Sequence, residues 1–272
     1  MKIEHTLFAL PFAYTAALLA QRGWPSLWAL AWITVAVIGG RTAAMAANRL
    51  LDARMDAKNP RTAQRAVASG RLRPAAMAVA AIVGLALLCL AALELRPICL
   101  ALVPIACIAL VTYPLVKRWT WAVHFVLGTV DALAPLGAWL AITGRFDMGA
   151  IVLFAAVTVW VAGFDVLYAL MDRDFDLREN VRSIPARFGQ RKSIGLAQWL
   201  HALLIVLLAW LGLVTKAHPL YWAGVGAALL LLGFEILLVR RRGDFFTLNA
   251  AVFKANMAFS VTFLAMTAAS WL

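Results

Sequence analysis

Long apolar stretches recur along the whole chain, separated by short segments that hold most of the charged residues. A helix of about 20 apolar residues can cross the hydrocarbon core of a bilayer. The pattern therefore predicts nine spans, with one domain over residues 1–272. Their expected ranges are 7–21, 27–51, 74–94, 98–116, 121–143, 149–171, 193–214, 219–239 and 249–271. The first is as short as a signal-peptide core but lacks a small-x-small cleavage site, so we expect it to be retained.

Composition supports an integral membrane protein. Hydrophobic residues make up 64% of the chain and charged residues 14%, whereas soluble domains are about half apolar and a quarter charged. The net charge of +12 would suggest nucleic acid as a partner of a soluble protein. In a membrane protein, the positions of the basic residues instead indicate which side of the membrane each loop faces. We therefore expect membrane lipids and no nucleic acid as partners. Cys89, Cys99 and Cys107 lie in apolar runs without CxxC spacing and are expected to be small buried residues.

The basic residues predict how the chain is oriented. If the N-terminus is cytoplasmic and the spans alternate, eighteen basic residues face the cytoplasm and four face the other side. The eighteen are Lys2, Arg54, Lys58, Arg61, Arg65, Arg71, Arg73, Lys117, Arg118, Arg173, Arg178, Arg182, Arg187, Arg191, Lys192, Arg240, Arg241 and Arg242, and the four are Arg22, Arg96, Arg145 and Lys216. This asymmetry predicts a multi-pass protein of the cell (inner) membrane, with the C-terminus outside.

Two acidic stretches emerge on the cytoplasmic side. In "NRLLDARMD" (48–56), Asn48, Asp52 and Asp56 are four residues apart, so on a helix they fall within about 80° of one another. Arg41, two turns earlier, shares their face. A helix from Leu27 to Asp52 would be about 38 Å long, which places Asp52 near the cytoplasmic interface and not at the midplane.

The second stretch is "DVLYALMDRDFD" (165–176). Helical spacing puts Asp165, Tyr168, Asp172 and Asp176 on one face, whereas Asp174 points away. A basic loop follows each stretch, at about 57–73 and 177–192. This shared order suggests a weak internal duplication, in which the second to fourth spans echo the sixth to eighth.

Carboxylates four residues apart on a helix repel each other. Ionisable groups near a bilayer are also costly, and inserting one at the centre of a membrane-spanning helix costs about 2.5–3.5 kcal/mol. Mg²⁺ would offset both effects, because it binds one or two carboxylates and fills its other positions with substrate phosphates and water. Nearby Arg and Lys would neutralise phosphate oxygens. A single stretch could be an ordinary interfacial pair of charges. Two on separate helices at the same membrane face favour a magnesium–diphosphate site.

These segments resemble the UbiA superfamily of intramembrane prenyltransferases. "NRLLDARMDAKNPRTAQR" resembles its first signature, NxxxDxxxD followed by R-T-x-x-R, and "DVLYALMDRDFD" its second, DxxYAxxDxxxD. "YPLVKR" (113–118) resembles a Tyr-x-x-x-Lys after the fourth span, and "RSIPARFG" (182–189) the end of the second loop. The resemblance covers essentially the whole chain. "EHTLFALPFA" is most similar to the branch linked to menaquinone made through futalosine, whose members are often labelled 4-hydroxybenzoate polyprenyltransferases.

The resemblance implies an all-α fold of nine helices bundled around a central cavity open to the cytoplasmic face. It implies Mg²⁺ as cofactor, with metal and diphosphate held by Asp52, Asp56, Asp172 and Asp176, supported by Asn48 and Asp165. Substrate-binding residues would be Arg41, Asn48, Arg61, Arg65, Tyr113, Lys117, Tyr168 and Arg182. Arg41 would contact diphosphate or an acceptor carboxylate, and Tyr168 would orient a carboxylate or line the acceptor pocket.

The implied activity is transfer of a prenyl group from polyprenyl diphosphate to an aromatic acid in ubiquinone or menaquinone synthesis. Haem or a lipid backbone is an alternative acceptor. A transporter is a different possibility, but it predicts acids near the midplane and inverted repeats, unlike the parallel repeat here.

Asp131 is a departure, because it lies inside the fifth span where relatives usually carry small or apolar residues. It either belongs to the site or pairs with Lys254 or Arg41.

Overall fold

The computed structural model describes residues 6–241 and 245–272, and these ranges contain helices and no strands. Within these described ranges, nine long helices lie where the nine spans are expected. They are α1 (Thr6–Gln21), α2 (Leu27–Leu51), α4 (Pro74–Glu94), α5 (Pro97–Thr112), α6 (Val123–Thr143), α7 (Met148–Ala169), α9 (Ile184–Thr215), α10 (Pro219–Arg241) and α11 (Phe245–Ala269). Short elements are α3 (Ala53–Lys58), η2 (Tyr113–Arg118), η3 (Leu170–Asp172) and α8 (Arg173–Arg178).

The helices confirm the multi-pass, all-α prediction. Eight of the described helices are long and apolar enough to cross a membrane, and the apolar part of α1, Ala9–Gln21, is shorter. The count of nine crossings and the orientation therefore stay predictions. Lys2 and Arg242, which entered the charge count, lie outside the described residues.

Local chemistry explains where several helices begin. Ser26 precedes α2 and its hydroxyl accepts a hydrogen bond from the amide of Ala29, which satisfies a free donor of the first turn. Pro74 and Pro97 occupy first-turn positions of α4 and α5, where a missing N–H is harmless.

The acidic stretches are not continuations of straight helices. Asp52 ends α2 with φ −97° and ψ 0°, and Asp172 has the same φ and ψ where η3 gives way to α8. Asp56 and Asp176 then lie on the separate short helices α3 and α8. The identical break supports the expected internal duplication and turns both chain segments across the end of the bundle.

The second loop is shorter than expected. The helix predicted from residue 193 begins at Ile184, because Ser183 caps it and Pro185 fits its first turn. A kink follows at Gly189, whose φ of 77° is a conformation that glycine adopts readily.

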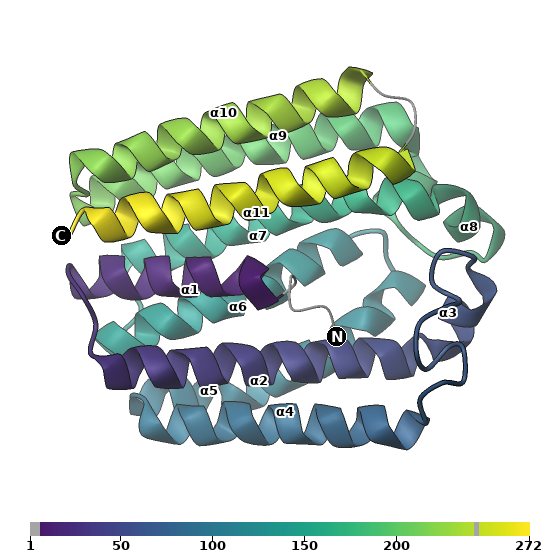
Figure 1. Cartoon of the computed structure of the whole chain (residues 1–272), viewed down its shortest axis with the longest axis horizontal. Helices are drawn as coiled ribbons and strands as arrows, with labels where there is room; N and C mark the ends of the chain where they lie inside the picture. The colour runs from purple at the N-terminus through teal and green to yellow at the C-terminus, as the bar shows by residue number, and fades with distance from the viewer. Residues whose placement is uncertain (1–5, 242–244) are drawn as a thin grey trace.

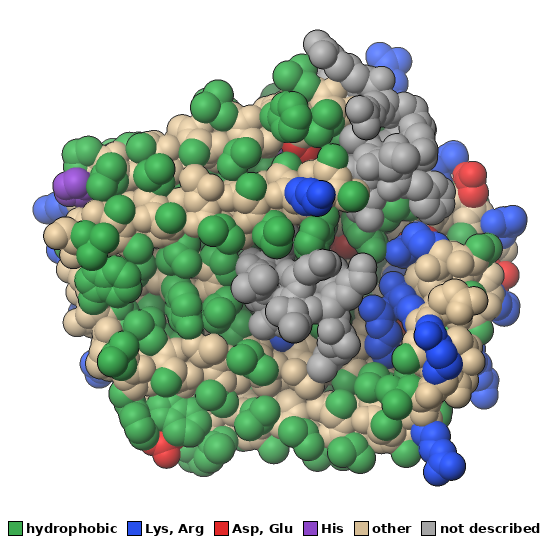
Figure 2. Space-filling view, in the orientation of Figure 1, with side chains coloured by type: hydrophobic (Ala, Val, Ile, Leu, Met, Phe, Trp, Pro, Cys, Tyr) green, Lys and Arg blue, Asp and Glu red, His purple; other side chains and the backbone are tan. Residues whose placement is uncertain are grey.

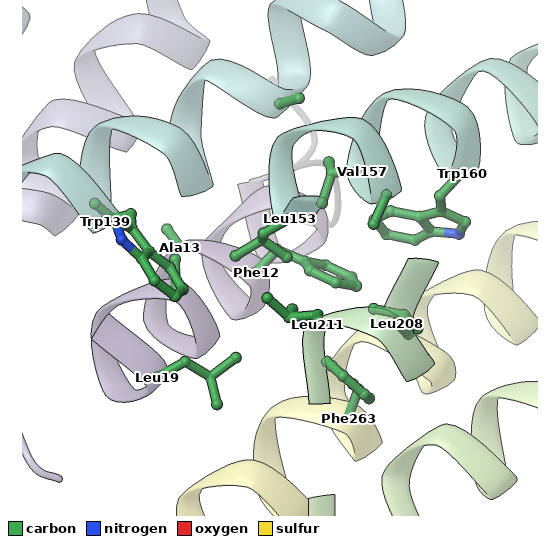
Figure 3. Close-up of a cluster of buried hydrophobic side chains, with 14 of the residues drawn as sticks. Phe12, Ala13, Leu19, Trp139, Leu153, Val157, Trp160, Leu208, Leu211 and Phe263 are labelled. Atoms are coloured by element: carbon green, nitrogen blue, oxygen red, sulfur yellow. The ribbon is translucent and has the colours of Figure 1, made fainter. Parts of the chain in front are cut away.

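The helices run side by side, with α3 and α8 together at one end and the C-terminus at the other (Figure 1). A core between α1, α7, α9 and α11 holds the bundle (Figure 3). Phe12 lies at its centre, with its ring centroid 4.8 Å from that of Trp160 and 5.8 Å from that of Phe263. Such aromatic contacts contribute packing energy, which matters in lipid because burial from water supplies little there.

The outer surface suits a lipid environment. Large apolar side chains such as Ile82 and Leu93 on α4, and Ile105 and Ile108 on α5, are exposed. Hydrophobic side chains cover most of the helical face in Figure 2, whereas Lys and Arg gather toward the end that carries α3. The molecule is therefore an integral membrane protein with one strongly basic end.

Close helix approach depends on small residues. On α6, a Cβ added to Gly128 would lie 2.3 Å from the backbone oxygen of Thr158 on α7. On α2, a Cβ added to Gly39 would lie 2.7 Å from the backbone oxygen of Gly84 on α4. Small residues at such crossings allow tight van der Waals packing between membrane helices.

Gly128 and Gly137 of α6 provide a matched stability test. Gly128→Ala should lower the free energy of unfolding by about 1–3 kcal/mol, the usual effect of overpacking. Gly137→Ala should leave stability unchanged or raise it by up to about 1 kcal/mol through helix propensity, because nothing lies within 4 Å of its added Cβ. Thermal unfolding in detergent would measure both. Equal stability of the two variants would contradict the close contact between α6 and α7.

Candidate active site

A cleft of about 210 Å³ opens where α2 and α7 end. Among the residues lining it are all the predicted site residues except Arg41: Asn48, Asp52, Asp56, Arg61, Arg65, Tyr113, Lys117, Asp165, Tyr168, Asp172, Asp176 and Arg182. Residues far apart in sequence thus meet because the segment after α2 binds the segment after α7: Asn59 and Arg61 donate to Asp172, and Lys58 donates to Glu179. We call this the acidic cleft.

The first stretch is buried and ion-paired. The Asp52 side chain is 2% exposed and pairs with the ammonium group of Lys117. Lys117 lies on η2, which directly follows α5. The other oxygen of Asp52, Oδ1, is buried and has no hydrogen-bond partner among the described residues. Asp56 accepts two bonds from Nη1 of Arg65, at 2.7 and 2.9 Å. Each carboxylate therefore carries a nearby positive charge, which offsets the loss of hydration.

The second stretch is held by the first loop. Arg61 donates from Nε to Oδ1 of Asp172 at 2.8 Å and from Nη2 to Oδ2. Its Nη1 donates to the Tyr168 hydroxyl at 3.0 Å, and the Asn59 amide donates to Asp172 at 2.9 Å. A bidentate arginine–carboxylate pair is strong and directional. The two signatures are thereby joined across the cleft.

Arg61 shows the balance of forces at this site. Burial lowers the pKa of its guanidinium, but the hydrogen bond and negative charge of Asp172 raise it by more, so its pKa lies above the ordinary value. Arg61 therefore stays charged and remains available for an anion that reaches the cleft.

Two further carboxylates have neutral partners. Asp176 accepts a hydrogen bond from the Ser183 hydroxyl at 2.7 Å. Asp165 lies 2.7 Å from Nδ1 of His124, whose Nε2 accepts from the Ile184 amide at 3.2 Å. Arg182, expected on the diphosphate, donates instead to the backbone oxygen of Trp119 in this structure.

Arg41 lies in an adjoining chamber of about 200 Å³. Asn48, Tyr113, Asp165 and Tyr168 line both this chamber and the acidic cleft. We call this space the Arg41 chamber. Nη1 of Arg41 lies 3.1 and 3.4 Å from the two oxygens of Asp131, and its buried Nε has no partner among the described residues.

The pairing of Asp131 decides between its two expected partners. Asp131 binds Arg41, whereas Lys254 on α11 is exposed. The pair lines the chamber, so Asp131 also lies at the site.

A largely apolar cavity of about 310 Å³ continues from the chamber into the bundle. Arg41, Ala44, Val130 and Asp131 line both spaces, and Val37, Leu140 and Phe146 line the apolar cavity alone. The three spaces form a series that runs from charged to apolar. Such a series fits a substrate with a charged head group and an apolar tail.

The described residues show no preformed cluster of three or more His, Cys, Asp or Glu side chains that could hold a metal ion. The carboxylates face basic side chains instead. The donor set is nevertheless suitable for Mg²⁺, since Asp52, Asp56, Asp172 and Asp176 offer hard oxygens in one cleft. Within the described part of the chain, Oδ1 of Asp52 has no partner.

Sequence reasoning missed several lining residues. Asn59 precedes Pro60, and its side chain accepts from the Arg61 amide at 3.0 Å, a turn that Asn-Pro spacing could have indicated. Ser183 was recognisable as a helix cap before Ile-Pro. His124 carried no usable signal, because its partners, Asp165 and Ile184, lie far away in sequence.

The fold and its spaces define a multi-pass membrane protein with a charged cleft that leads, through the Arg41 chamber, to an apolar cavity. The model of the UbiA prenyltransferase family matches residues 9–268. A 4-hydroxybenzoate octaprenyltransferase of Chromohalobacter salexigens is 33% identical, over 80% of this chain and 78% of that protein.

Solved structures agree. The apo structure of a UbiA homolog from Aeropyrum pernix K1 matches all of both chains, with a TM-score of 0.90 and 29% identity. A UbiA homolog from Archaeoglobus fulgidus bound to GPP and Mg²⁺ shares the fold, with a TM-score of 0.69 and 16% identity over 96% of this chain and 98% of that one. The chain therefore belongs to the UbiA prenyltransferase family, and it is a prenyltransferase.

Proposed function

We propose that this enzyme transfers a polyprenyl group from polyprenyl diphosphate to an aromatic acid in quinone biosynthesis. The observation that carries the proposal is the series of joined spaces: an acidic cleft, the Arg41 chamber and an apolar cavity. A diphosphate, an acceptor ring and a prenyl chain each require one of these environments. The name of the curated relative from Chromohalobacter salexigens supports the same class of reaction.

The diphosphate would occupy the acidic cleft together with Mg²⁺. Asp52, Asp56, Asp172 and Asp176 would hold the metal, with Asn48 in support, and bound Mg²⁺ would stabilise the charge that develops on the departing diphosphate. The homolog from Archaeoglobus fulgidus was solved with GPP and Mg²⁺, which supports this placement by analogy of fold alone.

Basic residues around the cleft would take the phosphate oxygens. Arg61, Arg65 and Lys117 now pair with carboxylates of the cleft. If the carboxylates bind a divalent metal ion instead, the Arg and Lys side chains become free to donate hydrogen bonds to phosphate oxygens. Arg182 would have to leave the backbone oxygen of Trp119 to join them.

The acceptor would bind in the Arg41 chamber. Nη1 of Arg41 is held by Asp131, whereas Nε is buried and no described residue bonds to it. A carboxylate of an aromatic acid would satisfy this edge of the guanidinium. Tyr168 and Tyr113 line the same chamber and would flank the ring. A lipid glycerol backbone without a carboxylate would leave the donor unsatisfied, so an acid is favoured.

In the reaction, the bond between prenyl C1 and the bridging diphosphate oxygen breaks, and the oxygen keeps the electron pair. The allylic cation is then attacked by the electron-rich ring, which forms the new carbon–carbon bond. The ring proton leaves, and its C–H electron pair restores the aromatic system. Placement of both substrates in adjoining spaces would supply much of the rate through proximity.

Among aromatic acids, 4-hydroxybenzoate and a naphthoate of the futalosine route both fit a ring with a single carboxylate.

We propose that the protein lies in the cell (inner) membrane with the acidic cleft at the cytoplasmic face. The excess of basic residues at the end that carries α3 supports this orientation.

Asp52→Asn should lower Mg²⁺-dependent transfer at least about 100-fold, a usual loss when one group that stabilises developing charge is removed. The matched control is Asp174→Asn, whose side chain is 85% exposed and should leave the rate within about twofold. Purified protein would be assayed with labelled prenyl diphosphate and aromatic acid, with Mg²⁺ or a chelator. Undiminished transfer by Asp52→Asn would reject the metal assignment.

Arg41→Leu should raise KM for the aromatic acid about 10- to 100-fold, since a hydrogen bond to a charged group contributes about 1.5–3 kcal/mol. The affinity for prenyl diphosphate should not change. Replacing Arg41 and Asp131 together by Leu avoids an unpaired buried carboxylate and should give the same result. The measurement compares kcat/KM for the acid and its neutral amide. A variant that still prefers the acid would exclude Arg41 as the carboxylate anchor.

A further inference from the structure

His124 lines the acidic cleft and connects three helices there. It lies on the first turn of α6, and its side chain is 3% exposed. Its Nδ1 is 2.7 Å from Oδ2 of Asp165 on α7, and its Nε2 is 3.2 Å from the amide nitrogen of Ile184, the first residue of α9. Both ring nitrogens are therefore in use.

These two contacts fix the form of the imidazole. The Ile184 amide can only donate, so Nε2 must accept and carries no proton. The proton of the neutral ring then lies on Nδ1 and points at Asp165. His124 thus donates to Oδ2 of Asp165 without supplying a positive charge. This arrangement sets the orientation of the carboxylate and leaves its charge uncompensated by that partner.

Asp165 differs in this respect from the other carboxylates nearby. Asp52, Asp56, Asp172 and Asp131 each pair with a Lys or Arg side chain. Asp165 can therefore take up a proton without first breaking an ion pair with a Lys or Arg side chain.

Asp165 also has the right position. It lines both the acidic cleft and the Arg41 chamber. Asp176, whose partner is the neutral Ser183, lines the cleft but not the chamber. Of the described carboxylates with a neutral partner, Asp165 is thus the one at the junction where prenyl C1 and the acceptor ring would meet.

We propose that Asp165 takes the ring proton released after prenylation and that His124 is the positioning residue that aims it. This inference rests on the proposed prenyl transfer to an aromatic ring. The new carbon–carbon bond forms first, the ring C–H bond then breaks, its electrons return to the ring, and the proton goes to Oδ1 of Asp165, the oxygen that His124 does not contact. His124 keeps its own proton throughout.

The packing of α6 supports a positioning role. Gly128 follows His124 by one helical turn and lies against the backbone of Thr158 on α7. That close contact holds the helix of His124 against the helix of Asp165. The amide of Ile184 fixes the other side of the ring.

Two amide substitutions separate the two contacts. In His124→Asn the side-chain NH₂ can occupy the place of Nδ1 and donate to Asp165. In His124→Gln the longer side chain reaches the place of Nε2, where its oxygen can accept from the Ile184 amide. Asn therefore preserves the contact with Asp165, and Gln preserves the contact with α9.

The assay measures kcat, KM for both substrates and the isotope effect with ring-deuterated acceptor. We expect His124→Asn to keep kcat within about fivefold of the wild type. His124→Gln should lose at least about 30-fold in kcat, somewhat less than the roughly 100- to 10,000-fold contribution of a general base, because the base remains but is no longer oriented, and KM for prenyl diphosphate should change little. Its isotope effect should rise above that of the wild type, because proton removal becomes slower.

The reverse order, an active Gln variant and an inactive Asn variant, would overturn the inference. It would mean that His124 acts by linking α6 to α9 through the Ile184 amide. Wild-type rates and isotope effects in both variants would also overturn it.

A second test places the Gln substitution in a background that lacks the base. In an Asp165→Asn background, His124→Gln should change kcat by less than about twofold, because the base that His124 positions is gone. A further loss of more than about fivefold would contradict the proposal. Failure of the proposed function is distinct, since the wild type would then give no prenyl product from any aromatic acid.

Discussion

Burial of carboxylates at the end of a membrane bundle is the constraint on which this structure depends. Asp52, Asp56 and Asp176 are each under a tenth exposed, so each requires a partner where water is scarce. Lys117 pairs with Asp52 and Arg65 with Asp56, and Arg61 of the first loop pairs with Asp172. The ion pairs therefore determine how η2 and the first loop lie over the cleft.

The same constraint explains how a substrate could enter. A diphosphate with Mg²⁺ brings both signs of charge, so it can exchange partners with the existing ion pairs while leaving no buried charge alone. Arg41 and Asp131 repeat the arrangement one step deeper, where the spare Nε of Arg41 is available to an acid. The apolar cavity lies beyond this chamber, and an apolar chain can enter it without exchanging any ion pair. Charge thus decreases in steps from the basic end toward the bundle interior.

Much of this organisation could be predicted from the sequence, since apolar length determines the spans and four-residue spacing brings the acids to one face. Local breaks were less accessible. Asp52 and Asp172 share the same non-helical backbone conformation, which no propensity signals. The early start of α9 at Ile184 depends on Ser183 and on the bend at Gly189. His124 and the choice of Arg41 over Lys254 for Asp131 depend on tertiary contacts between helices distant in sequence.

The most direct test is a structure of the protein with Mg²⁺ and an unreactive prenyl thiodiphosphate. Our account predicts the diphosphate in the acidic cleft, with metal bound by carboxylates of both signatures. Arg61 and Lys117 should have moved from Asp172 and Asp52 to phosphate oxygens, and the prenyl chain should lie in the apolar cavity. A diphosphate bound elsewhere, with both of those ion pairs intact, would contradict it.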